Sequence, residues 1–73
     1  MPDQDRLDHL ADQLDVIEED LRDRAYERLA AAAADPGSDE AREATATERR
    51  LNQARRAVAK ASSILRGRPT EDH

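Results

Sequence analysis

The chain has 73 residues, 40% of them charged, with a formal net charge of −5 and no cysteine, tryptophan or phenylalanine. Disulfides, thiolate metal ligands and a large aromatic core are therefore excluded, and the negative charge disfavours general attraction to nucleic acid or anionic lipid. No apolar run approaches the roughly 20 residues that span a bilayer. We expect one helical-hairpin domain over residues 1–73, with its core volume supplied by long helices or by a second subunit.

A long helix is predicted first, over about residues 4–34. Neither proline nor glycine interrupts residues 3–35, and Asp3 or Asp5 can cap the amino end. Along this segment a seam follows steps of three and four residues, which is the heptad spacing of packed helices and not the alternation of a strand. The residues of this predicted seam are Leu7, Leu10, Leu14, Ile17, Leu21, Ala25 and Leu29.

The only strong break in the pattern is the sequence "DPGS" at residues 35–38. Pro36 disfavours a helical backbone at Asp35, because the proline ring clashes with the preceding residue. Gly37 and the polar residues around it are typical of tight turns. We therefore predict a turn over residues 35–38.

A second helix is predicted over about residues 39–66, with Ser38 as its amino-terminal cap. Gly67 suits the left-handed conformation that ends a helix, which leaves residues 67–73 as a short tail. The predicted seam again follows steps of three and four. Its residues are Ala44, Thr47, Leu51, Ala54, Val58, Ala61 and Leu65.

The short turn makes the two helices antiparallel neighbours, so the predicted fold is an all-α, coiled-coil-like helical hairpin. Positions whose residue numbers add to roughly 72–75 should face each other, given the 3.6 residues of each helical turn. In this register Leu14 of the first helix meets Ala61 or Val58 of the second. Large side chains are thus expected opposite small ones.

Opposite charges are concentrated on the two arms. Residues 3–20 carry eight acidic side chains and one arginine, whereas residues 49–68 carry seven basic side chains and no acidic one. Because the hairpin places these stretches side by side, we favour internal neutralisation of the basic run over nucleic-acid binding. No groove-reading motif accompanies the arginines. The expected cross-helix pairs are Asp12 with Lys60 and Glu18 with Arg55.

The second helix is apolar over a wider arc than a two-helix seam requires, because Ala57 and Ile64 form a second strip. Such width is expected of a helix that contacts two neighbours, and a lone hairpin without disulfides is marginally stable. We therefore expect two hairpins to associate into a homodimeric four-helix bundle. The alternative is that Ile64 and Val16 are isolated apolar residues of the surface. The predicted self-association residues are Ala57, Ala61, Ile64 and Leu65.

A candidate binding site lies near the middle of the predicted hairpin. Tyr26 is the only aromatic residue and is expected across from Arg49 and Arg50. A tyrosine ring can stack on guanidinium groups, and the group could hold an anionic ligand or a carboxylate of a partner. The alternative is a tyrosine that shields the seam. The candidate partner-binding or anion-binding residues are Tyr26, Arg49, Arg50, Arg55 and Arg56.

Catalytic residues, metal sites and cofactors are not expected. His9 lies at helical spacing from Asp5, but no second nitrogen ligand is expected to face it. Ser62 and Ser63 have no histidine base opposite them, and the sequence contains no glycine-rich phosphate loop. The acidic amino-terminal segment lacks the apolar core of a signal peptide, which favours a cytoplasmic location. We therefore predict a non-enzymatic protein.

Two stretches, "AYERLAAA" at residues 25–32 and "ERRLNQARRAVAKA" at residues 48–61, resemble short uncharacterised two-helix proteins of high-GC actinobacteria. This resemblance implies a helical hairpin and brings no activity with it. We predict a small interaction or scaffold protein that self-associates and presents a helical surface to a protein partner, including a regulatory one. The alternative is an anion or nucleic-acid binder that uses the arginine-rich second helix.

Overall fold

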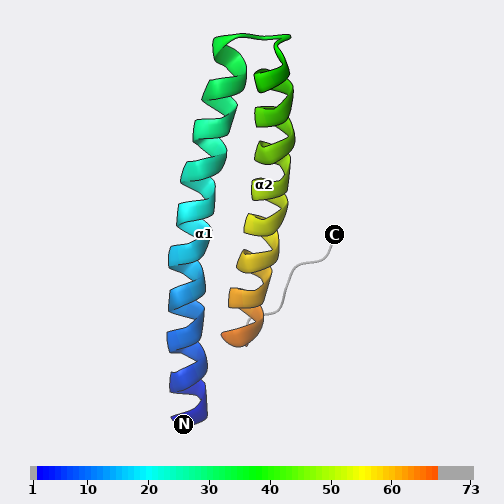
Figure 1. The fold of residues 1–73 in the computed structure, drawn as a ribbon. Coiled ribbons are helices and arrows are strands. Elements are labelled where there is room, and N and C mark those ends of the chain that lie inside the picture. The colour runs from blue at the N-terminus through cyan, green and yellow to red at the C-terminus, as the bar shows by residue number, and fades with distance from the viewer. Residues whose placement is uncertain (1, 68–73) are drawn as a thin grey trace.

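Two helices joined by a tight turn form the part of the chain that the computed structural model describes, residues 2–67 (Figure 1). α1 spans Pro2–Ala34 and α2 spans Asp39–Leu65. The prediction of an all-α hairpin is confirmed, and the helix bounds differ from the expected ones only at the outer ends. Apart from Gly67, the expected tail lies outside the described residues.

The turn and the start of α2 are held by Ser38. Its hydroxyl donates a hydrogen bond to the Asp35 carbonyl at 2.8 Å and accepts one from the Ala41 backbone N–H at 3.0 Å. The backbone of Ser38 is extended, with φ −74° and ψ 162°, as expected of an amino-terminal cap. Gly37 has φ 89°, a conformation that side chains disfavour. The turn residues therefore act as their sequence predicts.

The contact between the helices is lined by small side chains, and it differs from the predicted seam. Leu10, Ile17 and Leu29 were expected in the seam but are 43%, 47% and 55% exposed, and Ala54 is exposed as well. That part of the prediction was wrong. The buried residues, each at most 6% exposed, are Ala11, Ala25, Ala41, Ala44 and Ser62.

The row of α1 that faces α2 is displaced to one side of the predicted row, although it shares three leucines with it. Both rows have steps of three and four, so the spacing alone cannot choose between them. The alanines of the observed row, and Ser62 opposite them on α2, let the backbones approach closely, which a row with more leucines would prevent. The observed row on α1 consists of Leu7, Ala11, Leu14, Glu18, Leu21 and Ala25.

The register agrees with the predicted range. The Ser62 hydroxyl donates to the Ala11 carbonyl at 3.4 Å, and Arg55 donates to Glu18 at 3.4 Å. In each of these pairs the residue numbers add to 73. The expected contact between Glu18 and Arg55 is therefore confirmed.

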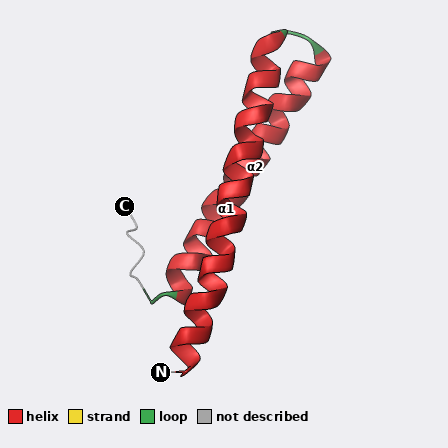
Figure 2. Cartoon of the chain, turned by 90° about the vertical axis from the view of Figure 1, so that its left-hand side faces the viewer, coloured by secondary structure: helices red, strands yellow, loops and turns green. Residues whose placement is uncertain are grey.

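The described part of the hairpin is a rod about 53 Å long, along which the two helices cross (Figure 2). α1 is the longer helix and extends beyond the end of α2 that lies away from the turn (Figure 1). Within residues 2–67, no helix has a stretch long and apolar enough to span a membrane. A rod of two helices has two long sides beside its seam, and these two sides carry different chemistry.

Candidate interaction surface

One side of the seam is bridged by charged and polar side chains. Arg66 donates hydrogen bonds to Asp12 at 2.8 Å and to Asp15 at 2.6 Å. Asp15 also accepts a hydrogen bond from the buried Ser62 hydroxyl at 2.6 Å. The two carboxylates raise the pKa of Arg66 above its ordinary value, chiefly through the hydrogen bond to Asp12. We call these four residues the polar edge.

Glu18 lies in the seam beside the polar edge and joins the helices at mid-length. It accepts hydrogen bonds from Arg22 of its own helix at 3.0 Å and from Arg55 of α2 at 3.4 Å. These bonds lower the pKa of Glu18 below its ordinary value, the one from Arg22 most, although partial burial opposes the shift. Arg55 also donates to Asn52 at 3.3 Å, so its guanidinium is engaged on both sides.

The expected pair of Asp12 and Lys60 does not form, because Asp12 bonds Arg66 instead. Lys60 is exposed and has no ion pair among residues 2–67. The reason is geometric: Lys60 lies two residues before Ser62, and two residues are about 200° of helical rotation, so Lys60 lies on the outer side of α2. The register sets Lys60 near the level of Asp12, as predicted, but its side chain leaves α2 on the side away from α1.

The other side of the seam is apolar and open. Leu10 and Ile17 each lie two residues from a carboxylate of the polar edge, and Ile64 lies two residues from Arg66. Since two residues correspond to about 200° of rotation, all three side chains emerge away from the polar edge, Ile64 toward the outer side of α2 next to Lys60. We call this surface the apolar face. Its residues are Leu10, Ile17, Ala54, Ala57, Ala61 and Ile64.

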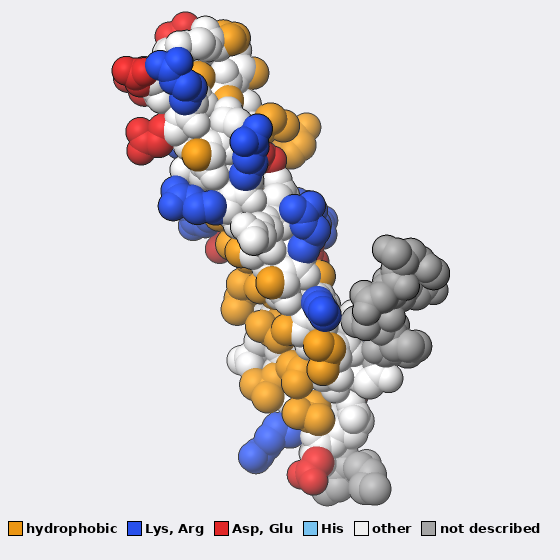
Figure 3. All heavy atoms as spheres, turned by 90° about the vertical axis from the view of Figure 1, so that its right-hand side faces the viewer, with side chains coloured by type: hydrophobic (Ala, Val, Ile, Leu, Met, Phe, Trp, Pro, Cys, Tyr) orange, Lys and Arg blue, Asp and Glu red, His pale blue; other side chains and the backbone are white. Residues whose placement is uncertain are grey.

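The apolar face is exposed at its largest side chains, with Leu10 at 43%, Ile17 at 47% and Ile64 at 58%. Figure 3 shows hydrophobic side chains gathered on the half of the molecule away from the turn, where α2 carries Ala57 and Ile64. Contiguous exposed apolar surface of this kind is typical of interaction sites.

The four predicted self-association residues share this side of α2. Ala57 and Ile64 are exposed, whereas Ala61 and Leu65 are half-buried because they border the seam. Val16, which is 67% exposed, lies on the far side of α1 from α2 and belongs to neither surface. Leu10 and Ile17 also lie on this surface, although their spacing predicts them in the seam. Their spacing of seven residues matches that of Ala57 and Ile64, but Leu7, Leu14 and Leu21 have the same spacing, so the pattern alone could not place them there.

The five predicted partner-binding or anion-binding residues do not form one site. Tyr26 is 74% exposed and has no ring contact or hydrogen bond within residues 2–67. Arg50 bonds Thr47 at 3.3 Å, and Arg55 is held by Glu18. Within residues 2–67 the Tyr26 ring therefore makes no stacking contact with a guanidinium group. Arg49, Arg55 and Arg56 do line one shallow groove of about 360 Å³, together with Glu48 and Asn52.

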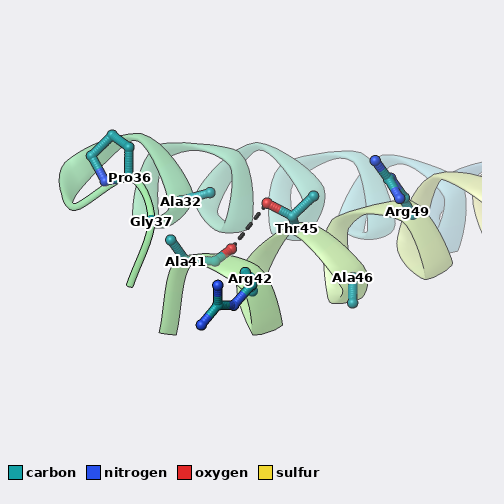
Figure 4. A pocket seen from close by; sticks show the side chains of 8 residues that line it. All are labelled: Ala32, Pro36, Gly37, Ala41, Arg42, Thr45, Ala46 and Arg49. Atoms are coloured by element: carbon teal, nitrogen blue, oxygen red, sulfur yellow. Dashed lines mark hydrogen bonds between the residues drawn. The ribbon is translucent and has the colours of Figure 1, made fainter. Parts of the chain in front are cut away.

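A second shallow groove, of about 440 Å³, lies beside the turn (Figure 4). Thr45 donates a hydrogen bond to the Ala41 carbonyl at 2.9 Å in this groove, so its hydroxyl is engaged within α2. Arg42 of the same groove pairs with Asp39. The lining is otherwise made of alanines and the turn, with Arg49 at one end. This groove offers no set of converging polar groups.

Within residues 2–67, no three of the histidine, aspartate and glutamate side chains are grouped so as to hold a metal ion. Comparison of the chain with protein-family models, with curated proteins and with solved structures gives no match. Statements about function therefore depend on the geometry of this chain, and the apolar face is its most distinctive feature.

Proposed function

We propose that this protein is a small non-enzymatic helical interaction protein, or scaffold. It self-associates through the apolar face into a four-helix bundle. Its remaining helical surface is presented to a protein partner, and regulatory proteins are among the partners that this surface would suit. The observation that carries this proposal is the exposure of Leu10, Ile17 and Ile64 on one side of a hairpin whose own seam fully buries only alanine and serine and leaves its leucines half-buried.

The weakness of the seam supports association. No large side chain within the described residues is fully buried, and the buried apolar residues are all alanines. A two-helix chain of this size without disulfides gains only about 3–5 kcal/mol from its own core. Covering the apolar face with a second copy would bury several larger side chains, each worth about 1.5–3 kcal/mol. Association thus offers the stabilisation that the single hairpin lacks.

The polar groups inside the hairpin support a structural role. The Ser62 hydroxyl, the side chain most resembling a nucleophile, bonds Asp15 and the Ala11 carbonyl and so serves helix packing. Arg55 and Arg66 are likewise occupied by carboxylates of α1. Part of the arginine content of α2 is therefore used in ion pairs with carboxylates of α1 within the same hairpin.

Sedimentation equilibrium at micromolar concentrations tests the proposal. We expect a mass that rises with concentration toward twice that of the chain. Ile64→Glu should raise the dissociation constant roughly hundredfold or more, because two copies of the side chain leave an apolar contact. Val16→Glu is the matched control on the far side of α1 and should change it by less than about threefold. A cooperatively folded monomer at all concentrations would contradict the proposal.

A second candidate function is the binding of an anion or a nucleic acid along α2. It is favoured by the exposure of Arg49 and Arg56, which have no ion pair among the described residues and share a groove. Binding to phosphates releases counterions, so affinity for DNA or RNA must fall steeply as salt rises. Absence of binding in about 20 mM salt would eliminate this candidate.

A further inference from the structure

α1 carries a second heptad row beside the row that contacts α2. Its steps alternate three and four along the whole stretch, and every member is exposed. A helix with two adjacent heptad rows is suited to two helical neighbours, of which the hairpin supplies only one. The members of this row, which we call the outer row, are Asp3, Arg6, Leu10, Gln13, Ile17, Asp20 and Arg24.

The outer row is complementary to itself when two copies run in opposite directions. In an antiparallel pair, residues whose numbers add to a constant lie opposite each other. With that constant at 26 or 27, Leu10 meets Ile17 and Gln13 meets its own copy. The same alignment sets Asp3 opposite Arg24 and Arg6 opposite Asp20. The contacts between unlike residues each occur twice, as a two-fold axis requires, and the contact of Gln13 with its own copy occurs once, on the axis.

We propose that the apolar face is covered by a second copy of this chain, whose α1 lies antiparallel along α1, with the two-fold axis passing beside Gln13 and the two turns at opposite ends of the bundle. This inference rests on the self-association proposed above and specifies its arrangement. It is carried by the charge pattern of the outer row, which places opposite charges together at both ends of an apolar centre.

The other face-to-face arrangement, with both turns at one end, lacks this complementarity. It would place α1 over α2 of the second copy, at the level set by the pairs whose numbers add to 73. Arg24 would then lie at the level of Arg49 and Arg50 of the second copy, and Asp20 at the level of the uncharged Gln53. Arginine would meet arginine where the antiparallel arrangement sets Arg24 against Asp3, and such a contact disfavours a partner.

The apolar strip of α2 fits the same axis. The register of the hairpin places Lys60 at the level of Gln13. Ala57 and Ile64 lie three residues before and four residues after Lys60. An axis at this level therefore sets Ala57 opposite Ile64 of the second copy, so that a small side chain meets a large one. Both helices are thus centred on one axis, although their sequences differ.

Charge reversal tests the arrangement. Arg6→Asp should raise the dimer dissociation constant about tenfold in low salt, because two attractions become two repulsions. Asp20→Arg should weaken the dimer at least as much, since it also loses its pair with Arg24 in the same helix. The dimer dissociation constant of the double variant should return to within about threefold of that of the natural chain. The two positions are about 21 Å apart within one helix, so recovery requires contact between copies. Asp5→Arg, on another side of α1, is the control for net charge.

A thiol at the axis gives an independent test. The chain has no cysteine, so Gln13→Cys introduces a single thiol that meets its own copy only in the antiparallel arrangement. Mild oxidation should convert this variant to a covalent dimer, whereas Val16→Cys should stay monomeric on a denaturing gel. A chain that dimerises, but shows neither the covalent dimer nor rescue by the double charge variant, overturns the arrangement and leaves self-association standing. A chain that never dimerises overturns both.

Discussion

The polar edge and the apolar face border the same seam, yet only one of them is closed by the hairpin itself. Arg66, Ser62 and Asp15 form hydrogen bonds across the polar edge, whereas Leu10 and Ile64 of the apolar face remain about half exposed. Hydrogen bonds are directional and are satisfied by one partner at one distance. Apolar surface is satisfied only by exclusion of water, and two helices cannot exclude water from both sides of their contact.

This difference assigns separate roles to the two sides. The polar edge fixes the register of α2 against α1, because Ser62 and Arg66 each reach particular carboxylates. The apolar face adds little to the register and leaves apolar area for another molecule. Substitutions on the polar edge and in the seam should therefore change the stability of the fold, and substitutions on the apolar face should change association.

The largest effect on folding is expected from Ala11→Leu. Ala11 is completely buried where α2 crosses, so a larger side chain must push the helices apart and should cost about 1–3 kcal/mol of unfolding free energy. Ala54→Leu is the same substitution on the apolar face, and it should not lower the unfolding free energy of the hairpin. Chemical denaturation followed by circular dichroism measures both. Equal losses would show that the seam and the apolar face are packed alike.

A smaller effect is expected from Ser62→Ala. The buried Ser62 hydroxyl donates its one hydrogen chiefly to Asp15 at 2.6 Å, with the Ala11 carbonyl at 3.4 Å, and its removal should cost about 1–2 kcal/mol. Ser63→Ala is the matched control, since Ser63 has no side-chain hydrogen bond among residues 2–67. Thermal melts of the two variants give the comparison. If both variants have the same melting temperature as the natural chain, the hydrogen bonds of Ser62 at the polar edge do not stabilise the hairpin.

The smallest effect concerns pH. The pKa of Glu18 is lowered in the folded chain, mainly by its hydrogen bond from Arg22, so its stabilising contribution is present above the ordinary pKa near 4.5 and is lost as the pH falls through the lower folded value. The hairpin should therefore melt at a lower temperature at about pH 2.5 than at pH 7 in low salt. About 1 M salt should narrow the gap, because it reduces the screening length to about 3 Å.

The variant Glu18→Gln tests whether Glu18 is a source of the lower melting temperature in acid. Its melting temperature should fall less between pH 7 and about pH 2.5 than that of the natural chain. Glu27→Gln removes an exposed carboxylate that has no partner within the described residues and serves as the control. Greater stability in acid would contradict the view that the carboxylates of α1 face the arginines of α2.

Some features of the candidate surface could be predicted from single residues and others could not. Ile64 was expected to lie outside the seam, because it widens the apolar arc of its helix. Leu10 and Ile17 were expected inside the seam, because leucine and isoleucine at heptad spacing are typical of one. Their exposure could not be predicted, since Ala11 and Glu18 also follow heptad spacing with the shared leucines, and the choice between the rows depends on the second helix.

The sequence by itself determined the two helices and the turn between them, and it limited the register to pairs whose numbers add to roughly 72–75. These depend on local properties: proline and glycine interrupt a helix wherever they stand, Ser38 caps the residues that follow it, and a short turn limits which residues can lie side by side. The tertiary structure alone decided how each helix is rotated about its own axis. Rotation depends on the packing of both helices at once, and here the small side chains of Ala11 and Ser62 allow a close approach that excludes Leu10 and Ile17 from the contact. That rotation is what leaves the apolar face open.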